Sequence, residues 1–226
     1  MLRRIITADG STTLLHETLG ETYHSVKGAL AESLHVYIRA GLEFVQEQTP
    51  DAPVHILEVG YGTGLNALLT LSHAAQTVFY TGIEPYPIQD EELNTCRELN
   101  DPNFSMQHGT AARLPWRRPE SLGDFHPVSN RFYLRKLHCS LETCNITEPV
   151  SLVYFDAFAP KYQPELWLEE VWKHLETLLQ PNAVMVTYCA QGAFRRMLQQ
   201  RNWVVERLPG PPAQKKEMIR GRFAKL

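Results

Sequence analysis

Residues 55–64 read HILEVGYGTG, an apolar run that ends in three glycines at alternate positions. Residues 56–59 are apolar enough for a buried strand, and the pattern over residues 65–69 predicts a helix directly after the glycines. A strand, a glycine loop and a helix let a ligand approach the backbone closely, and the N–H groups of the helix terminus point toward that ligand. The segment therefore predicts an α/β domain that binds a nucleotide-like cofactor.

The spacing of the glycines bears on the class of cofactor. Counted from Gly60, the dinucleotide fingerprint G-x-G-x-x-G fails, because leucine occupies the third glycine position. Counted from Gly62, a relaxed form that ends in alanine is met by Gly64 and Ala67. The pattern E-x-G-x-G-x-G, which begins at Glu58, is the usual signature of S-adenosylmethionine binding in Rossmann-like methyltransferases. We favour the methyl donor and keep a dinucleotide as the alternative.

The composition excludes several classes of protein. The chain has 226 residues, 43% of them hydrophobic, which is enough for one continuous core. No apolar stretch approaches the ~20 residues of a membrane span, and the apolar run after the basic N-terminus is too short for a signal peptide. The cysteines show neither a C-x-x-C pair nor the spacing of a disulfide framework. We therefore expect a cytoplasmic protein with reduced thiols and no metal site.

Charge is distributed unevenly along the chain. The net charge of −3 argues against a general nucleic-acid binder. Residues 1–101 carry 14 acids and 5 bases, however, whereas residues 195–226 carry 9 bases and 2 acids, and residues 111–140 carry 6 bases and 2 acids. A positive pole of this kind suits phosphate contacts, because these respond to the local field. On charge alone, a solvated surface explains the clustering equally well.

The remaining chain alternates between predicted strands and helices. An Asp-Gly turn at residues 9–10 predicts a hairpin, and an apolar stripe predicts a helix over residues 26–48. Residues 101–131 contain four prolines, lack a clear period and predict a long loop or insertion. After the glycine loop the predicted strands cover residues 78–83, 132–137, 150–155, 184–188, 203–207 and 217–222, and the predicted helices cover residues 88–99, 164–179 and 191–200.

This order of elements predicts an α/β protein with the Rossmann-like class I methyltransferase fold. We expect a seven-stranded, mostly parallel sheet with a C-terminal antiparallel pair and a small N-terminal β-hairpin extension. Residues 1–226 are expected to form a single domain. Within it, residues 1–48 make up the hairpin and helix extension, and residues 54–226 make up the Rossmann-like core.

Residues that end the predicted strands are candidates for the cofactor site, since ligands of open α/β sheets bind outside the carboxyl ends of the strands. Glu84 ends the second core strand, where its carboxylate can accept hydrogen bonds from both ribose hydroxyls. Ser140 follows the third strand and is a candidate for contact with the adenine amino group. Asp156 ends an otherwise apolar fourth strand, which places it beside the sulfonium and the incoming nucleophile.

Several segments resemble one known family. They resemble the methyltransferase half of the bacterial bifunctional enzymes of the MnmC type, which complete 5-methylaminomethyluridine at the tRNA wobble position. The resemblance spans nearly the whole chain, and the D-A-F-A-P segment that begins at Asp156 is its most specific part. The matching segments are residues 9–35, 58–66, 156–161 with 164–167, 187–196, and 215–218.

The resemblance implies methyl transfer from S-adenosylmethionine to the amine of 5-aminomethyl(-2-thio)uridine in tRNA. The expected partner is the anticodon stem-loop of tRNA. The sequence has no counterpart of the family's flavin-dependent half, so we expect other wobble-uridine modification enzymes to supply the aminomethyl substrate. It also departs from the family at Ser140, where relatives tend to carry an acid. The cofactor-binding residues implied are Glu58, Gly60, Gly62, Gly64, Asn66, Glu84, Ser140 and Asp156.

The chemistry of an amine nucleophile assigns further roles. An alkylamine is mostly protonated at neutral pH, so Asp156 is expected to orient the amine and accept its proton. Phe158 is expected to stack on the flipped uracil, although a place in the core would explain it nearly as well. Tyr23 and His24 are candidates to close over the site. The expected tRNA-binding residues also include Lys161, Lys215, Lys216 and Arg220.

Other functions remain open at this point. An aminopropyltransferase has a related fold and an acid after the fourth strand, but it would normally lack a basic tail. A dinucleotide-binding module would explain Gly62, Gly64 and Ala67 but not the segment that begins at Asp156. A non-catalytic RNA-binding relative would not need the complete set of cofactor residues.

Overall fold

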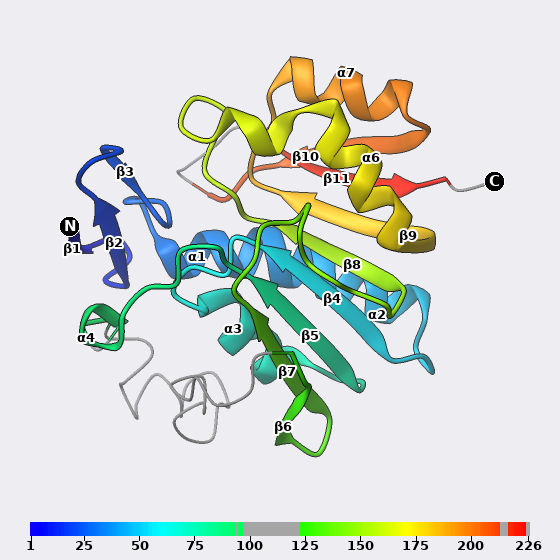
Figure 1. The fold of residues 1–226 in the computed structure, drawn as a ribbon, viewed down its shortest axis with the longest axis horizontal. Helices are drawn as coiled ribbons and strands as arrows, with labels where there is room; N and C mark the ends of the chain where they lie inside the picture. The colour runs from blue at the N-terminus through cyan, green and yellow to red at the C-terminus, as the bar shows by residue number, and fades with distance from the viewer. Residues whose placement is uncertain (94, 97–122, 213–216, 225–226) are drawn as a thin grey trace.

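A large twisted sheet with helices on both faces dominates the computed structural model, which describes residues 1–93, 95–96, 123–212 and 217–224 (Figure 1). The described part of this sheet has eight strands in the order β10-β11-β9-β8-β4-β5-β7-β6. Strands β7, β5, β4, β8 and β9 run parallel, whereas β11 is antiparallel to both β9 and β10. The strands are β4 (Val54–Val59), β5 (Val78–Ile83), β6 (His126–Ser129), β7 (Phe132–Leu137), β8 (Val150–Phe155), β9 (Leu179–Thr187), β10 (Trp203–Pro209) and β11 (Glu217–Phe223).

The fold class is the predicted one, but the prediction of seven strands was wrong. The eighth strand, β6, lies inside the segment expected to be a loop and pairs with β7 in an antiparallel, irregular register. It is an edge strand with little burial, which tolerates Pro127 and needs no alternation of apolar and polar residues. The part of the expected loop at residues 101–122 lies outside the described residues.

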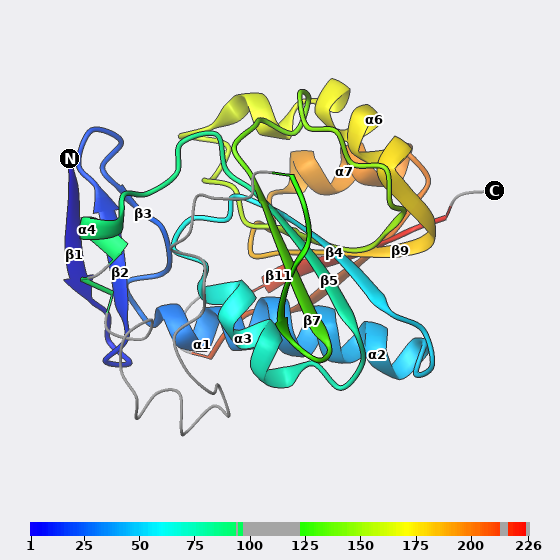
Figure 2. The same ribbon diagram turned by 60° about the horizontal axis from the view of Figure 1, so that its bottom comes forward.

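Helices cover the two faces of the sheet and enclose two hydrophobic cores (Figure 2). On one face lie α1 (Ala29–Ser33), η1 (Leu34–Glu43), α2 (Phe44–Gln48) and α3 (Leu65–His73). On the other face lie α6 (Glu169–Leu178) and α7 (Gly192–Gln200). The first three of these helices form the predicted helical segment without a break, but its centre, η1, is a π-helix.

Two other predicted helices differ in extent from those of the structure. The one expected over residues 164–179 is divided into the 3-10 helix η3 (Pro164–Trp167) and α6, because Leu168 between them has an extended backbone. Of the helix expected over residues 88–99, the structure describes α4 (Asp90–Leu93), and much of the remainder lies outside the described residues. No helix in the described part of the chain is long and apolar enough to cross a membrane.

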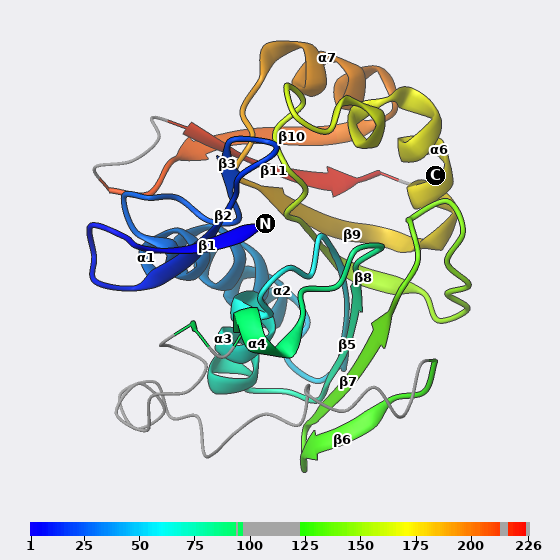
Figure 3. The same ribbon diagram turned by 60° about the vertical axis from the view of Figure 1, so that its left-hand side comes forward.

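The N-terminal extension is a small antiparallel sheet of β1 (Leu2–Ile6), β2 (Thr12–His16) and β3 (Glu21–Thr22), rather than a simple hairpin. Figure 3 shows it standing in front of the large sheet. Its turn is joined to the first helix: Ser11 Oγ accepts hydrogen bonds from the N–H groups of Ala29 and Leu30, and Asp9 Oδ2 accepts one from that of Ala31. These contacts satisfy the free donors at the start of α1 and fix the small sheet against the core.

Candidate cofactor and active site

A cavity of about 550 Å³ lies between the N-terminal sheet and the carboxyl ends of the strands in the large sheet. This is the position at which open α/β sheets bind their ligands. Its walls come from the N-terminal sheet, the glycine loop, the ends of β5 and β7, and the segment after β8. The lining residues are His16, Leu19, Tyr23, His24, Val59, Gly60, Gly62, Ile83, Glu84, Pro85, Tyr86, Cys139, Ser140, Leu141, Glu142, Asp156, Ala157, Phe158, Tyr162, Gln163, Glu165 and Leu166.

The glycine loop forms the floor of this cavity, and two of its glycines meet close neighbours. Gly60 and Gly62 have φ values of 88° and 49°, in the left-handed region that favours glycine. A Cβ atom at Gly60 would lie 2.7 Å from the carbonyl oxygen of Asp156, and one at Gly62 would lie 3.0 Å from the ring of Tyr23. The loop can therefore touch both the end of β8 and the N-terminal sheet only with glycine at these positions. Gly64 (φ 79°) precedes α3 and is not among the lining residues.

Glu84 is anchored at the edge of the glycine loop, as its position at the end of β5 suggests. Its carboxylate accepts hydrogen bonds of 3.1 Å from the backbone N–H groups of Gly62 and Tyr86. Burial raises the pKa of Glu84, although these two hydrogen bonds oppose the shift. The anchored Glu84 carboxylate can accept hydrogen bonds from the ribose hydroxyls of an adenosyl cofactor. Gly60 and Gly62 leave the backbone beside it open to close approach by that cofactor.

The end of β7 contributes two polar side chains to the wall. Ser140 lines the cavity, and its hydroxyl oxygen lies 3.1 Å from Thr143 Oγ1. Glu142, which the sequence interpretation did not single out, lines the cavity as well. It supplies a carboxylate near the position where the family resemblance implied an acid. Glu142 lies only two positions after Ser140, and this proximity in sequence could have marked it as a second candidate for the adenine contact.

The carboxylate of Asp156 has partners on both oxygens. Tyr37 donates a hydrogen bond of 2.6 Å to Oδ1, and Asn66 donates one of 2.8 Å to Oδ2. The Asn66 amide also donates a hydrogen bond of 2.8 Å to Glu58 Oε1, so it bridges two acids. Tyr37 belongs to the helix predicted from its apolar stripe over residues 26–48, and the sequence analysis missed this contact.

Glu58 and Asn66 lie behind Asp156, away from the cavity surface. They are 0% and 1% exposed, respectively, and neither is among the lining residues. In this structure Asn66 contacts Asp156 directly and Glu58 contacts Asn66, and the expectation that both residues bind the cofactor directly stays a prediction. Burial raises the pKa of Glu58 well above its usual value, and the negative charge of Asp156 adds to the shift.

The segment from Asp156 to Phe158 is held by its backbone. The Tyr188 hydroxyl donates a hydrogen bond of 2.9 Å to the carbonyl oxygen of Ala157. The N–H group of Phe158 donates to Gln163 Oε1 at 3.2 Å, and Trp167 Nε1 donates to the carbonyl oxygen of Phe158 at 2.9 Å. These contacts give the residues after β8 a defined position on the cavity wall.

The N-terminal sheet supplies an aromatic and a neutral histidine side chain to the same wall. The rings of Tyr23 and Phe158 pack edge to face with centroids 5.2 Å apart. His24 Nε2 lies 3.0 Å from Thr63 Oγ1 in the glycine loop. Burial lowers the pKa of His24 to about 4, so its imidazole is neutral near neutral pH. Both candidates from this segment therefore lie at the cavity, next to the glycine loop.

The predicted tRNA-binding bases lie in different surroundings. Lys161 is exposed, with its Nζ 4.9 Å from the centre of the Tyr162 ring. Lys215 and Lys216 lie outside the described residues. The guanidinium of Arg220 pairs with Glu206 at 2.9 Å and lies 3.6 Å from the centre of the Phe44 ring, and its side chain is only 14% exposed. Arg220 thus makes structural contacts in this structure, and the phosphate-binding role expected for it stays a prediction.

Comparison with known proteins agrees with this fold. Residues 128–224 match the model of a family described as S-adenosyl-L-methionine-dependent methyltransferase. The structure resembles the crystal structure of MNMC2 from Aquifex aeolicus with a TM-score of 0.79 and 24% identity, over 100% of this chain and 73% of the other. The fold, the glycine loop and the family match are those of S-adenosyl-L-methionine-dependent methyltransferases, which this chain resembles.

Within this class, the chain is similar to the bifunctional proteins called tRNA 5-methylaminomethyl-2-thiouridine biosynthesis protein MnmC. It is 29% identical to that of Pseudoalteromonas atlantica over 96% of this chain and 27% identical to that of Hydrogenovibrio crunogenus over 90%. The chain spans about a third of the length of these relatives, 33% and 32%. The resemblance inferred from the sequence is confirmed, and it concerns the methyltransferase part of the MnmC proteins.

Proposed function

We propose that this enzyme methylates the amine of 5-aminomethyl(-2-thio)uridine at the wobble position of tRNA, giving 5-methylaminomethyl(-2-thio)uridine. The observation that carries the proposal is the position of Asp156, a carboxylate on the cavity wall that accepts hydrogen bonds from the neutral side chains of Tyr37 and Asn66. A carboxylate in this position can meet a cationic amine that enters the cavity. The MnmC names of the relatives supply the identity of that amine.

Asp156 is the proton acceptor in this proposal. When bound, S-adenosylmethionine supplies a methyl group that is already activated on a sulfonium. The protein must therefore align the amine and remove one of its protons, which frees the lone pair for attack. The ammonium of the substrate donates its proton to the carboxylate of Asp156, which leaves a neutral amine and a carboxylic acid. The fixed backbone from Asp156 to Phe158 keeps this acceptor in one place.

Tyr23 and Phe158 form the wall for the uracil ring. Their edge-to-face contact offers an aromatic surface on which a flipped base stacks, a contact worth ~1–3 kcal/mol per base in single-stranded nucleic acid. Burial raises the pKa of Tyr23 to about 12, with a further contribution from Glu84 and Glu92, so its hydroxyl remains protonated. The pair is therefore an uncharged surface next to the charged acceptor.

The other side of the cavity takes the methyl donor. In this proposal Gly60 and Gly62 let the cofactor approach the backbone, and Glu84 accepts hydrogen bonds from its ribose hydroxyls. Ser140 and Glu142 flank the adenine, where their oxygens can accept hydrogen bonds from the exocyclic amine.

The phosphates of the anticodon stem-loop meet bases outside the cavity. Lys161 is exposed and lies next in sequence to Tyr162, which lines the cavity. Lys215 and Lys216 belong to the basic C-terminal segment and are kept as tRNA-binding candidates. A tRNA substrate implies a cytoplasmic location and a supply of aminomethyluridine from other wobble-uridine modification enzymes.

The test is methyl transfer to tRNA that carries 5-aminomethyluridine. The tRNA is incubated with the enzyme and isotopically labelled S-adenosylmethionine, digested, and its nucleosides are analysed by mass spectrometry. Labelled 5-methylaminomethyluridine is the expected product. Asp156→Asn serves as the matched control for chemistry at the site. Labelled methyl groups at another nucleoside, or none in the tRNA with an enzyme that binds S-adenosylhomocysteine, would contradict the proposal.

A transferase for a small free amine is the second candidate. The cavity is lined by Glu84, Glu142, Asp156 and Glu165, and such a set of acids also suits a polyamine. Parallel reactions with putrescine and spermidine, with either S-adenosylmethionine or its decarboxylated form, separate this candidate from the first.

A further inference from the structure

The Asp156 carboxylate is held from behind by two side chains that do not touch the cavity. Tyr37 belongs to η1 and Asn66 to α3, and each is 1% exposed. Their donor atoms lie 2.6 and 2.8 Å from the two carboxylate oxygens. Both carboxylate oxygens are therefore held by side chains of the interior, while Asp156 itself lines the cavity.

The Tyr37 hydroxyl is not required to fill space. The Tyr37 ring packs in the core beside Tyr154, with ring centroids 5.3 Å apart, and a phenylalanine ring would fill the same volume. Burying a hydroxyl without an acceptor costs free energy, so a tyrosine at this position depends on its hydrogen bond to Asp156. The chemistry of the contact, rather than the packing, accounts for tyrosine here.

The helix that carries Tyr37 has an unusual geometry. Tyr37 lies in the π-helical element η1, and π-helical turns are rare and frequent at functional sites. The same element approaches the sheet closely at Gly41, where a Cβ atom would lie 3.0 Å from Val186 Cγ2 and 3.2 Å from Tyr154 Cε1. Close approach of η1 brings the Tyr37 hydroxyl within reach of the end of β8.

The groups that act on this cluster from the surrounding elements are acids and phenols. The charges of Asp156, Glu32 on α1 and Tyr188 after β9 raise the pKa of Tyr37, in addition to its burial. On the other side of Asn66, the charges of Asp156 and of Glu84 after β5 raise the pKa of Glu58 on β4, and a hydrogen bond with Tyr80 on β5 lowers it. Asp156 thus receives hydrogen bonds from neutral donors in an otherwise acidic environment, and a cationic substrate would relieve that excess of negative charge.

We propose that Tyr37 is a positioning residue whose hydroxyl, together with the Asn66 amide, keeps the Asp156 carboxylate ionised and directed into the cavity. This inference rests on the proposed role of Asp156 as the proton acceptor. A hydrogen bond to the charged form of an acid favours ionisation, so the loss of the Tyr37 hydroxyl raises the pKa of Asp156. From the usual strength of a hydrogen bond to a charged group, a shift of about 1–2 pH units is expected.

The test compares Tyr37→Phe with Tyr154→Phe. Both substitutions remove a buried hydroxyl from the same part of the core, but that of Tyr154 lies 3.2 Å from Thr70 Oγ1 rather than at Asp156. The pH at which Asp156 ionises is measured by NMR of the carboxyl carbon in ¹³C-labelled protein without cofactor, with the signal assigned by its loss in Asp156→Asn. Tyr37→Phe should raise this midpoint by about 1–2 units, and Tyr154→Phe should leave it in place.

Single-turnover rates on 5-aminomethyluridine tRNA supply the second readout. Tyr37→Phe should slow methyl transfer roughly 10–100-fold, because the carboxylate loses one of the two contacts that fix its direction, with the affinity for S-adenosylhomocysteine unchanged. In an Asp156→Asn background the same substitution should cause no further loss, because Tyr37 acts through Asp156.

The outcomes separate the inference from the proposed function. An unchanged midpoint in folded Tyr37→Phe, or an equal loss of rate in both backgrounds, means that Tyr37 is structural only and overturns the inference. Full activity of Asp156→Asn instead removes the proton acceptor and overturns the proposed chemistry. If Tyr37→Phe does not fold, Asn66→Ala tests the same arrangement from the other oxygen, and an unchanged midpoint there also overturns it.

Discussion

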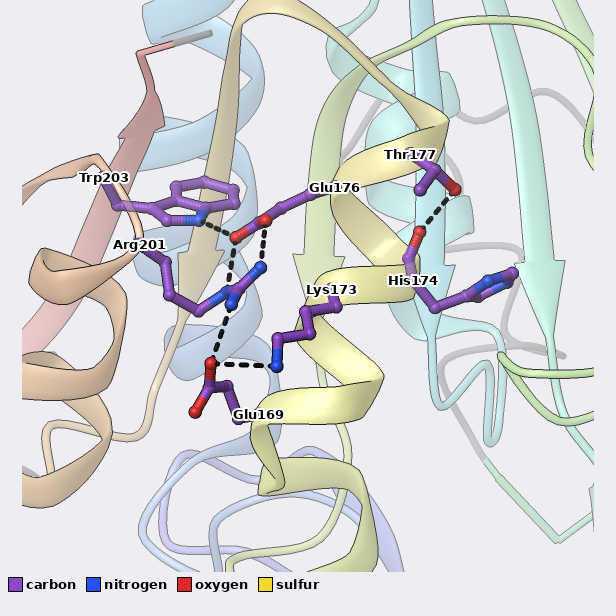
Figure 4. A network of polar contacts seen from close by, with 7 residues as sticks. All are labelled: Glu169, Lys173, His174, Glu176, Thr177, Arg201 and Trp203. Atoms are coloured by element: carbon purple, nitrogen blue, oxygen red, sulfur yellow. Dashed lines mark hydrogen bonds and ion pairs between the residues drawn. The ribbon is translucent and has the colours of Figure 1, made fainter.

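Asp156 and Glu176 both have two hydrogen-bonded carboxylate oxygens, but their partners differ in charge. Asp156 receives its hydrogen bonds from a phenol and an amide. Glu176, on α6, receives two from the guanidinium of Arg201, at 2.9 and 2.5 Å, and one of 2.9 Å from Trp203 Nε1 (Figure 4). Arg201 also pairs with Glu169 at 2.9 Å.

The difference explains why one carboxylate suits chemistry and the other suits structure. The charge of Glu176 is compensated by a bidentate cation, and the hydrogen bonds to Glu176 raise the pKa of Arg201. The contacts join α6 to Arg201 at the end of α7 and to Trp203 on β10. Asp156 accepts hydrogen bonds from the neutral side chains of Tyr37 and Asn66, and in the proposed function its charge faces a cationic substrate. For a carboxylate in a folded protein, the charge of its partners therefore says more about function than their number does.

Removing the charge of Asp156 tests the comparison where the effect is largest. Asp156→Asn keeps the shape but cannot accept the amine proton, so the single-turnover rate should fall roughly 10²–10⁴-fold, with tRNA affinity little changed. Rapid-quench measurement at saturating tRNA and cofactor gives the rate. A near-normal rate would mean that the amine loses its proton in solvent before binding.

Removing the charge of Glu176 should affect stability instead. Glu176→Gln leaves Arg201, which is 15% exposed, without its bidentate partner, and should lower the free energy of unfolding by about 2–4 kcal/mol. Denaturation in urea measures the loss, and the methyl-transfer rate of the folded variant should stay within about 2-fold of the original. Glu169→Gln is the matched control: the Glu169 side chain is itself 52% exposed, so the loss of its ion pair with Arg201 should cost much less stability. Equal costs for both variants would contradict the role given to the bidentate pair.

His24 is a base that burial keeps neutral, in contrast to the two carboxylates. Its pKa is about 4 in the folded protein and near 6.5 in the unfolded chain, so the unfolded state binds the proton more strongly. The contribution to stability is complete above pH 6.5 and decreases as pH falls toward 4, by up to about 3 kcal/mol. Urea denaturation across this pH range should show the decrease, and His24→Gln should lose that part of the slope. An unchanged slope would mean that the imidazole is protonated in the fold.

Glu84 is a third anchored carboxylate with neutral donors, but it lies at the cofactor end of the cavity. Glu84→Ala should weaken binding of S-adenosylmethionine by about 1–3 kcal/mol, as expected for a lost hydrogen bond to a charged group. Calorimetry measures this, with Glu142→Ala as a comparison at the proposed adenine contact, where a smaller loss is expected. Unchanged affinity in Glu84→Ala would remove it from the ribose site.

The smallest effects concern two cations, Lys161 and Arg220, whose partners differ in charge as those of the two acids do. Lys161 is exposed, whereas Arg220 is paired with Glu206. Lys161→Ala should reduce the salt dependence of tRNA binding by about one unit of slope, because one phosphate contact is lost. Arg220→Ala should leave that slope in place. Fluorescence anisotropy over a range of salt concentrations measures both, and the reverse result would show that Arg220 leaves its ion pair to bind tRNA.

The sequence identified those parts of the fold and site that depend on neighbours in the chain. The glycine loop, Glu84 and Asp156 were found because each follows an apolar strand directly, and parallel strands bring their carboxyl ends to one edge. Strand β6 could not be found in this way. An exposed edge strand with a proline lacks the alternation that marks a half-buried strand.

Side-chain direction and partner charge were decided by tertiary structure alone. Glu58 and Asn66 belong to the glycine motif, yet the fold turns both toward Asp156 and away from the cavity. Tyr37 lies 119 positions before Asp156 in the sequence and reads as a core residue, and only the packing of η1 against the sheet brings their oxygens to 2.6 Å. Local pattern determines which element a residue joins, since it reflects nearest-neighbour geometry and burial. The contacts that set the charge state and direction of a carboxylate come from elements distant in sequence. Only the packing of those elements in the folded protein determines such contacts.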